Sequence, residues 1–153
     1  MGVDAIAVLF MMTQEIKYNT VEYTESLALR SDVLRVPLGK ELSASDTLDE
    51  ENQLHFGCFS DHQLKGCVVV KVIENKARVK LRQMAVAKSF QGKGVGKKLV
   101  LDVEVLLKEI GVKIIELSAR ETAILFYEKL GYEVAGNSYI EQGIEHIKMQ
   151  KNI

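Results

Sequence analysis

Three glycines at alternate positions mark the junction between a segment rich in β-branched residues and a segment with helical periodicity: Gly92, Gly94 and Gly96. Glycine adopts main-chain conformations that other residues avoid, and it lets the backbone come close to a ligand. The first N–H groups of the following helix have no acceptors within that helix, and together with the helix dipole they attract anions. Nearby lysines add positive charge: Lys93, Lys97 and Lys98. This junction therefore predicts a strand–loop–helix unit that binds a phosphate or pyrophosphate group.

Two common phosphate-binding motifs do not match this stretch. The Walker P-loop ends in Gly-Lys-Ser/Thr, and Gly96-Lys97-Lys98 lacks the hydroxyl that binds magnesium. The Rossmann pattern requires a glycine where Lys97 stands, directly after the first strand of a βαβ unit. From the glycines alone, a turn that binds nothing stays an open alternative.

The pattern of polar and apolar residues predicts one mixed α/β domain. Short polar gaps between three runs rich in β-branched residues favour antiparallel hairpins. Residues 19–37 favour a helix that Asn19 caps, with Glu22 completing a capping box and Pro37 ending the helix. The polar residues 38–53 favour a loop. In chain order we expect strands at 11–18, 54–60, 64–73, 77–86, 112–119, 132–136 and 144–151, and helices at 19–37, 96–111 and 121–131.

Length and composition limit the possible partners. The chain has 153 residues, 47% hydrophobic and 27% charged, which suits one globular domain with a substantial core. A formal net charge of −1 argues against nucleic acid or an anionic membrane as the partner. The apolar residues 5–12 are too short to span a bilayer and lack the flanks of a signal peptide. We expect a cytoplasmic protein.

The chain start offers a second methionine pair, Met11 and Met12. Residues 1–11 are therefore a possible N-terminal extension, followed by a single domain at 12–153. Cys58 and Cys67 each lie in an apolar run, which predicts buried free thiols, whereas a disulfide would need an oxidising compartment. Two cysteines and three scattered histidines predict no metal site.

Two stretches of the chain resemble the GNAT acetyltransferases. The run Gln91-Gly92-Lys93-Gly94-Val95-Gly96 matches the family signature Q/R-x-x-G-x-G/A. Residues 119–132, ARETAILFYEKLGY, are similar to the second cofactor element, in which A-x-x-F-Y-x-K-x-G-F/Y recurs. Both stretches have the order and spacing of the family, and the resemblance covers about residues 12–151. It implies the α/β (α+β) GNAT fold, a mixed and mostly antiparallel sheet flanked by helices and splayed between strands 4 and 5.

The resemblance also implies acetyl-CoA as the cofactor. Backbone N–H groups would hold its pyrophosphate, and the fourth strand would pair with the pantetheine arm and polarise the thioester carbonyl. Arg120 departs from the family pattern, which often has asparagine there, and Phe126 equally suits the core. The implied cofactor-binding residues are Met84, Ala85, Val86, Gln91, Gly92, Lys93, Gly94, Val95, Gly96, Lys97, Arg120 and Phe126.

In this family a neutral amine usually attacks the thioester directly, which needs a base for the amine and an acid for the leaving thiolate. Tyr127 is similar in position to the tyrosine that often serves as the acid, and a phenol with a pKa near ~10 suits that transfer. Packing beneath the cofactor is the alternative role for Tyr127. Many relatives carry a carboxylate base on the fourth strand, but here that strand offers Lys80, Arg82 and Gln83. His146 is the alternative base, and deprotonation by water alone stays open.

We expect residues 19–53 and the loop 136–144 to select the acceptor, which the resemblance implies is an amine, with a small molecule favoured. Arg30 and Arg35 suit an acidic substrate. An acidic run in the same region suits a cationic amine, or is merely solvated: Asp46, Asp49, Glu50 and Glu51. Two other classes of protein stay open: a catalytically silent acyl-CoA-binding module and a nucleic-acid-binding domain, the latter disfavoured by the net charge. A homodimer is expected only because such folds often form one.

Overall fold

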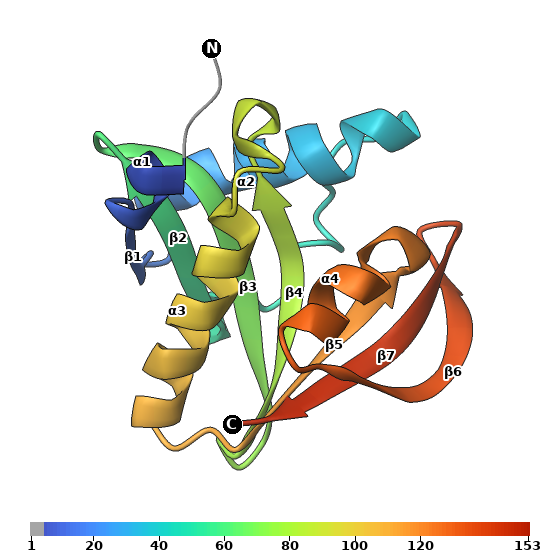
Figure 1. The fold of residues 1–153 in the computed structure, drawn as a ribbon. Coiled ribbons are helices and arrows are strands. Elements are labelled where there is room, and N and C mark those ends of the chain that lie inside the picture. Colours follow the sequence, from blue (N-terminus) through green and yellow to red (C-terminus); the bar gives the residue numbers. More distant parts are fainter. Residues whose placement is uncertain (1–4) are drawn as a thin grey trace. The chain divides into compact units, whose positions relative to one another are not determined.

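The computed structural model describes residues 5–153, and Figure 1 shows the course of the chain. Its helices are α1 Ala5–Leu9, α2 Val21–Leu34, α3 Val95–Glu109 and α4 Ile124–Lys129. Its strands are β1 Met12–Glu15, β2 Leu54–Ser60, β3 Gln63–Glu74, β4 Arg78–Val86, β5 Ile114–Arg120, β6 Glu133–Glu141 and β7 Ile144–Asn152. The sheet order is β1-β2-β3-β4-β5-β7-β6, with β4 and β5 parallel. The expected mixed, mostly antiparallel α/β architecture is confirmed.

The chain divides into two compact units. The first comprises the described residues up to Val70 together with Gln83–Val103, and the second comprises Lys71–Arg82 and Glu104–Ile153. The division cuts through three elements, because β3, β4 and α3 each contribute residues to both units.

The first unit is built on the antiparallel strands β1, β2 and β3. Ile16, Tyr23 and Phe59 form a buried cluster against which Leu27 and Leu64 pack. Helix α2 begins one residue later than expected, because the Thr20 side chain, not Asn19, accepts a hydrogen bond from the Tyr23 N–H at 3.2 Å. The predicted Asn19 cap is therefore wrong. Asn19 instead has a φ of 63° and turns the chain into the helix.

The second unit is organised around β7. All seven residues of β5 pair with β7, and β6 pairs with its other edge, whereas β4 pairs with β5 only from Arg78 to Lys80. Ile115, Leu117 and Met149 are buried in its core. Glu104 accepts a hydrogen bond from the Tyr132 hydroxyl at 2.9 Å and from Lys151 Nζ at 2.8 Å. These bonds connect the end of α3 to the C-terminal strand.

Two hairpins have two-residue turns with positive φ at both positions, and the turn between β3 and β4 has three residues, the first two with positive φ. In chain order these positive-φ pairs are Asp61-His62, Asn75-Lys76 and Gln142-Gly143. This backbone matches the right-handed twist of the flanking strands, which explains why such short polar gaps suffice. The last of these turns corrects the sequence prediction. Residues 136–141 are not a loop, because β6 continues to Glu141 and pairs with β7 up to the turn. The expected role of residues 136–144 in selecting the acceptor stays a prediction.

The apolar N-terminal segment forms α1, and Val8 and Met11 are buried. The prediction that residues 1–11 are an extension stays a prediction, and residues 1–4 lie outside the described part of the chain. Within residues 5–153, every helix is too short or too polar to cross a bilayer. Cys58 and Cys67 are buried free thiols, as expected. Burial raises the pKa of Cys67 to about 12 and also raises that of Cys58.

Candidate functional site

In the first unit, the glycine loop joins β4 to α3 after a single 3₁₀ turn at Lys88–Phe90. Gly92 has a φ of 72° and Gly94 a φ of 92°, and a Cβ atom at either position would meet nothing within 4 Å. The backbone conformation, rather than crowding, therefore requires glycine at these two positions. Gly96 differs, because it lies inside the first turn of α3.

The start of α3 leaves a set of main-chain donors at the surface. The Lys98 N–H donates to the Gly94 carbonyl at 3.0 Å, which is the first hydrogen bond of the helix. The N–H groups of Val95, Gly96 and Lys97 consequently have no intrahelical acceptor. The Val95 side chain is buried and anchors the helix start, while Gly94 and Lys97 are exposed. This arrangement suits an anion such as a pyrophosphate.

The three lysines of the loop are not equivalent. Lys98 Nζ forms an ion pair with Asp102 at 2.9 Å, and Asp102 also accepts a hydrogen bond from the Thr13 hydroxyl at 2.6 Å. Lys93 and Lys97 are exposed at the loop and the first helical turn. The positive charge available to a ligand is therefore that of Lys93 and Lys97.

At the end of β4, some backbone N–H groups point toward β3 and others point toward the opposite edge of the strand. The Ala87 N–H donates to the Lys65 carbonyl on β3 at 2.8 Å. Because successive N–H groups of a strand point to opposite edges, those of Met84 and Val86 point away from β3. Gln91 Nε2 donates to the Val86 carbonyl at 2.9 Å and so connects the glycine loop to the end of the strand. This bond gives the glutamine of the signature a structural role.

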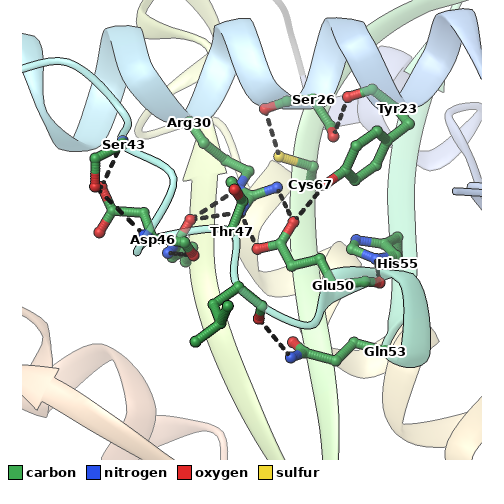
Figure 2. A network of polar contacts seen from close by, with 12 residues as sticks. Tyr23, Ser26, Arg30, Ser43, Asp46, Thr47, Glu50, Gln53, His55 and Cys67 are labelled. Atoms are coloured by element: carbon green, nitrogen blue, oxygen red, sulfur yellow. Dashed lines mark hydrogen bonds and ion pairs between the residues drawn. The ribbon is translucent and has the colours of Figure 1, made fainter. Parts of the chain in front are cut away.

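A buried network of polar side chains lies beside this strand, and Figure 2 shows it. Arg30 of α2 is 0% exposed and pairs with Glu50, which is 1% exposed, through both of its terminal nitrogens. The Tyr23 hydroxyl donates to Glu50 at 2.7 Å, and burial together with this carboxylate raises the pKa of Tyr23. The backbone carbonyl of Glu50 accepts a hydrogen bond from His55 Nε2 at 2.8 Å.

The network corrects the expectation about acceptor charge. Arg30 pairs with Glu50, and Arg35 forms a second ion pair with Asp46 at 3.0 Å. The hydrogen bond from Arg35 lowers the pKa of Asp46 to about 2. Both arginines therefore pair with two of the four acidic residues, while Asp49 and Glu51 are exposed.

Gln83 is a residue of the first unit to which the sequence analysis assigned no catalytic or binding role. It lies within β4 but has a φ of 49°. Its side-chain oxygen accepts hydrogen bonds from Arg30 Nε at 2.9 Å and Nη2 at 2.6 Å, and its Nε2 donates to the Asp46 carbonyl at 3.0 Å. No short-range sequence pattern reveals such contacts, because its partners lie 53 and 37 residues away.

In the second unit, Tyr127 lies on α4 and is 8% exposed. Its ring makes edge contacts with Tyr132, at 5.6 Å between centroids, and with the half-buried Phe126, at 5.0 Å. Burial raises the pKa of Tyr127 to about 12. The Tyr127 hydroxyl has no hydrogen-bond partner among the described residues. In the same part of the chain, every buried side-chain oxygen does have a partner. The hydroxyl therefore reaches the protein surface.

His146 lies on β7 and is 7% exposed. Its Nδ1 is 2.8 Å from the Ile144 carbonyl, which can only accept, so Nδ1 is protonated and Nε2 is the ring nitrogen that remains for another partner. Nε2 faces the Glu141 carboxylate at 3.8 Å. Glu141 was not among the residues expected from the sequence, because it fell in the predicted loop.

Arg120 and His146 are direct partners across β5 and β7, and Tyr139 is the partner of His146 on β6. Paired residues point to the same face of a sheet, so these three side chains form a row. The Tyr139 ring stacks near His146 at 6.2 Å, and its hydroxyl shares a hydrogen bond with Ser118. No described hydrogen bond or ring contact joins Tyr127 to this row.

Glu116, the carboxylate on β5, is already neutralised. It accepts from Arg78 at 3.1 Å and from Lys148 at 3.1 Å. Both contacts pair this carboxylate with cations of the protein itself.

Comparison with known proteins shows the family and supports the fold. The family model described as an acetyltransferase (GNAT) domain matches residues 33–153. YyaT, an uncharacterized protein of Bacillus subtilis, is 31% identical over 133 residues, covering 84% of this chain and 88% of its own. The crystal structure of ElaA from Escherichia coli has a TM-score of 0.79 at 19% identity and covers 93% of this chain and 99% of its own. A Bacillus subtilis acetyltransferase in complex with CoA has a TM-score of 0.66 at 20% identity and covers 94% and 99%. The chain belongs to the GNAT acetyltransferase family.

Proposed function

We propose that this protein is an N-acetyltransferase that transfers the acetyl group of acetyl-CoA directly to an amine. The observation that carries the proposal is a continuous row of main-chain N–H groups, from the end of β4 through the glycine loop to the start of α3. The free strand edge at Met84 and Val86 leads into the open glycine loop and the exposed N–H groups at the start of α3. Acetyl-CoA, the cofactor of the family, supplies an acetyl group activated as a thioester.

The residues of this path fit the two ends of the cofactor. Met84, Ala85 and Val86 would bind the pantetheine arm as an added strand, which needs exposed N–H and C=O groups. The backbone from Gln91 to Lys97 would bind the pyrophosphate, with Lys93 and Lys97 adding charge. Arg120 and Phe126 are proposed as further contacts.

We assign the role of acid to Tyr127. A phenol with a pKa of about 12 keeps its proton throughout the neutral range, so the side chain is a donor and not a base. The raised pKa also makes full proton transfer to a thiolate uphill. The role proposed for Tyr127 is therefore a hydrogen bond from its hydroxyl to the leaving sulfur as negative charge develops there.

We assign the role of base to His146. The Ile144 carbonyl fixes its tautomer, and the free Nε2 lies beside the Glu141 carboxylate. The carboxylate attracts an ammonium group, and it stabilises the imidazolium that forms when Nε2 takes the proton. We favour a small-molecule amine, because one carboxylate and one imidazole recognise a single ammonium group rather than an extended chain. The two free thiols suit the cytoplasm, where we place the enzyme.

The alternative is a catalytically silent acyl-CoA-binding module, which the absence of a carboxylate on β4 favours. Both functions require the cofactor, so the first experiment is calorimetric titration with acetyl-CoA, with CoA and ATP for comparison. Gly94→Glu should weaken binding of acetyl-CoA. Gly111→Glu is the matched control, because Gly111 has a φ of 98° with nothing within 4 Å of its Cβ position and lies at the far end of α3.

Two results of this titration would refute the proposal. One is wild-type protein that does not bind acetyl-CoA, and the other is equal weakening by the two glutamate variants. After binding is established, a library of amines screened for release of free CoA thiol separates the enzyme from the silent module.

A further inference from the structure

The conformation of Gln83 is unusual for a strand residue. Its φ of 49° lies in the left-handed region, which residues other than glycine adopt uncommonly. It directly precedes Met84, the first of the three residues whose backbone is proposed to bind the acyl arm. The strand therefore contains a strained residue at the point where its proposed function begins.

The side chain of Gln83 holds this conformation in place. Its amide group makes three hydrogen bonds, two from Arg30 and one to the Asp46 carbonyl. The guanidinium of Arg30 is planar and its other donors are fixed by Glu50, so the position of the Gln83 oxygen is fixed as well. Figure 2 shows Arg30 reaching from α2 toward Glu50.

The backbone of Gln83 determines where the Met84 N–H points. That N–H lies in the rigid peptide plane between residues 83 and 84, so the torsion angles of Gln83 set its direction. If the side chain of residue 83 were not held, the backbone would relax toward the extended region, and the plane would rotate.

We propose that Gln83, held by the Arg30–Glu50 pair, is a positioning residue that directs the Met84 N–H at the thioester carbonyl of bound acetyl-CoA. The proposal rests on the proposed function, because it requires acetyl-CoA to lie along β4. It makes Arg30 and Glu50 part of the cofactor site without any contact between them and the cofactor.

The test compares wild-type protein with Gln83→Ala. CoA lacks the acetyl group, so the ratio of its Kd to that of acetyl-CoA reports the contacts of that group, and the change of this ratio in a variant at residue 83 reports the contact of the carbonyl. We expect the ratio to fall about fivefold in Gln83→Ala, the change that corresponds to one neutral hydrogen bond. The infrared band of bound [1-¹³C]acetyl-CoA should move to higher wavenumber, because a carbonyl without the donor is less polarised.

Two further variants separate positioning from stability. Tyr23→Phe removes a hydrogen bond to Glu50 but leaves the contacts between Arg30 and Gln83 in place, so it should lower stability without changing the ratio or the band. In Gln83→Gly the Kd ratio should fall by less than in Gln83→Ala, because glycine reaches the left-handed region without strain but is not held there. It also provides the test if Gln83→Ala does not fold.

The inference is overturned if a folded Gln83 variant keeps the wild-type Kd ratio and carbonyl band, whatever its stability. It is also overturned if Tyr23→Phe changes both by as much as Gln83→Ala does, because a general loss of stability would then explain the effect. Failure of the proposed function looks different, since wild-type protein itself would not bind acetyl-CoA.

Discussion

Glu50→Gln should destabilise the protein far more than its near-isosteric change suggests. Glu50 is 1% exposed, and its carboxylate accepts hydrogen bonds from both terminal nitrogens of Arg30 and from the Tyr23 hydroxyl. Glutamine keeps one oxygen but turns an NH₂ group toward the guanidinium donors, and it leaves the charge of Arg30 buried without compensation. Breaking a buried ion pair from one side costs about 3–5 kcal/mol in the free energy of unfolding.

Urea unfolding measures this loss, and the chain provides a matched control. Glu51→Gln is the same substitution at the next residue, which is exposed, so its effect should stay within about 0.5 kcal/mol. Combining Glu50→Gln with Arg30→Met removes the uncompensated charge. The double variant should therefore be more stable than the sum of the single losses implies, by about 2 kcal/mol. Equal effects of the two glutamine substitutions, or additive effects in the cycle, would refute the reasoning.

Three further predictions follow from the site and its surroundings. Because Arg35 lowers the pKa of Asp46 to about 2, the carboxylate stabilises the fold above its unfolded pKa near ~3.9. Between pH 4 and pH 2, as the carboxylate is protonated, wild-type protein should lose about 1–2 kcal/mol that Asp46→Asn does not lose, and parallel pH profiles in urea unfolding would contradict this. Tyr127→Phe should reduce turnover about 10²-fold or more while the Kd of acetyl-CoA stays unchanged, whereas unchanged turnover would favour packing alone. Lys97→Ala should weaken acetyl-CoA about fivefold in a salt-sensitive way, while Lys98→Ala, whose ammonium group is bound to Asp102, should change the Kd little. The reverse order in calorimetry would show that the ion pair opens to the cofactor.

The sequence predicted those features that local chemistry determines. Strand β2 is observed at Leu54–Ser60 as expected, and the hairpins occur where short polar pairs interrupt runs of β-branched residues. The glycine loop followed the same logic, because a positive φ in an open turn is a property of the residue itself. By contrast, the sequence offered two adjacent capping residues, Asn19 and Thr20. Only the backbone angles show that Thr20 is the cap and that Asn19 turns the chain.

The features that the sequence did not predict depend on distant partners. Arg30 and Glu50 are 20 residues apart and appeared as two opposite charges with separate roles, although each is the reason that the other can be buried. The extension of β6 to Glu141 depends on its pairing with β7, since the weakly apolar residues 136–141 carry no strand pattern of their own. The position of Glu141 beside His146 follows from that pairing and could not be read from either segment alone.

The burial of the two thiols simplifies enzymology. The chain has only two cysteines, and both are enclosed, with pKa values raised by burial. Reagents that colour or alkylate thiolates therefore find little to react with on the folded protein. A chromogenic readout of liberated CoA should start from a low background without mutating the enzyme. A cysteine introduced at the surface would then be the single attachment point for a fluorophore or spin label.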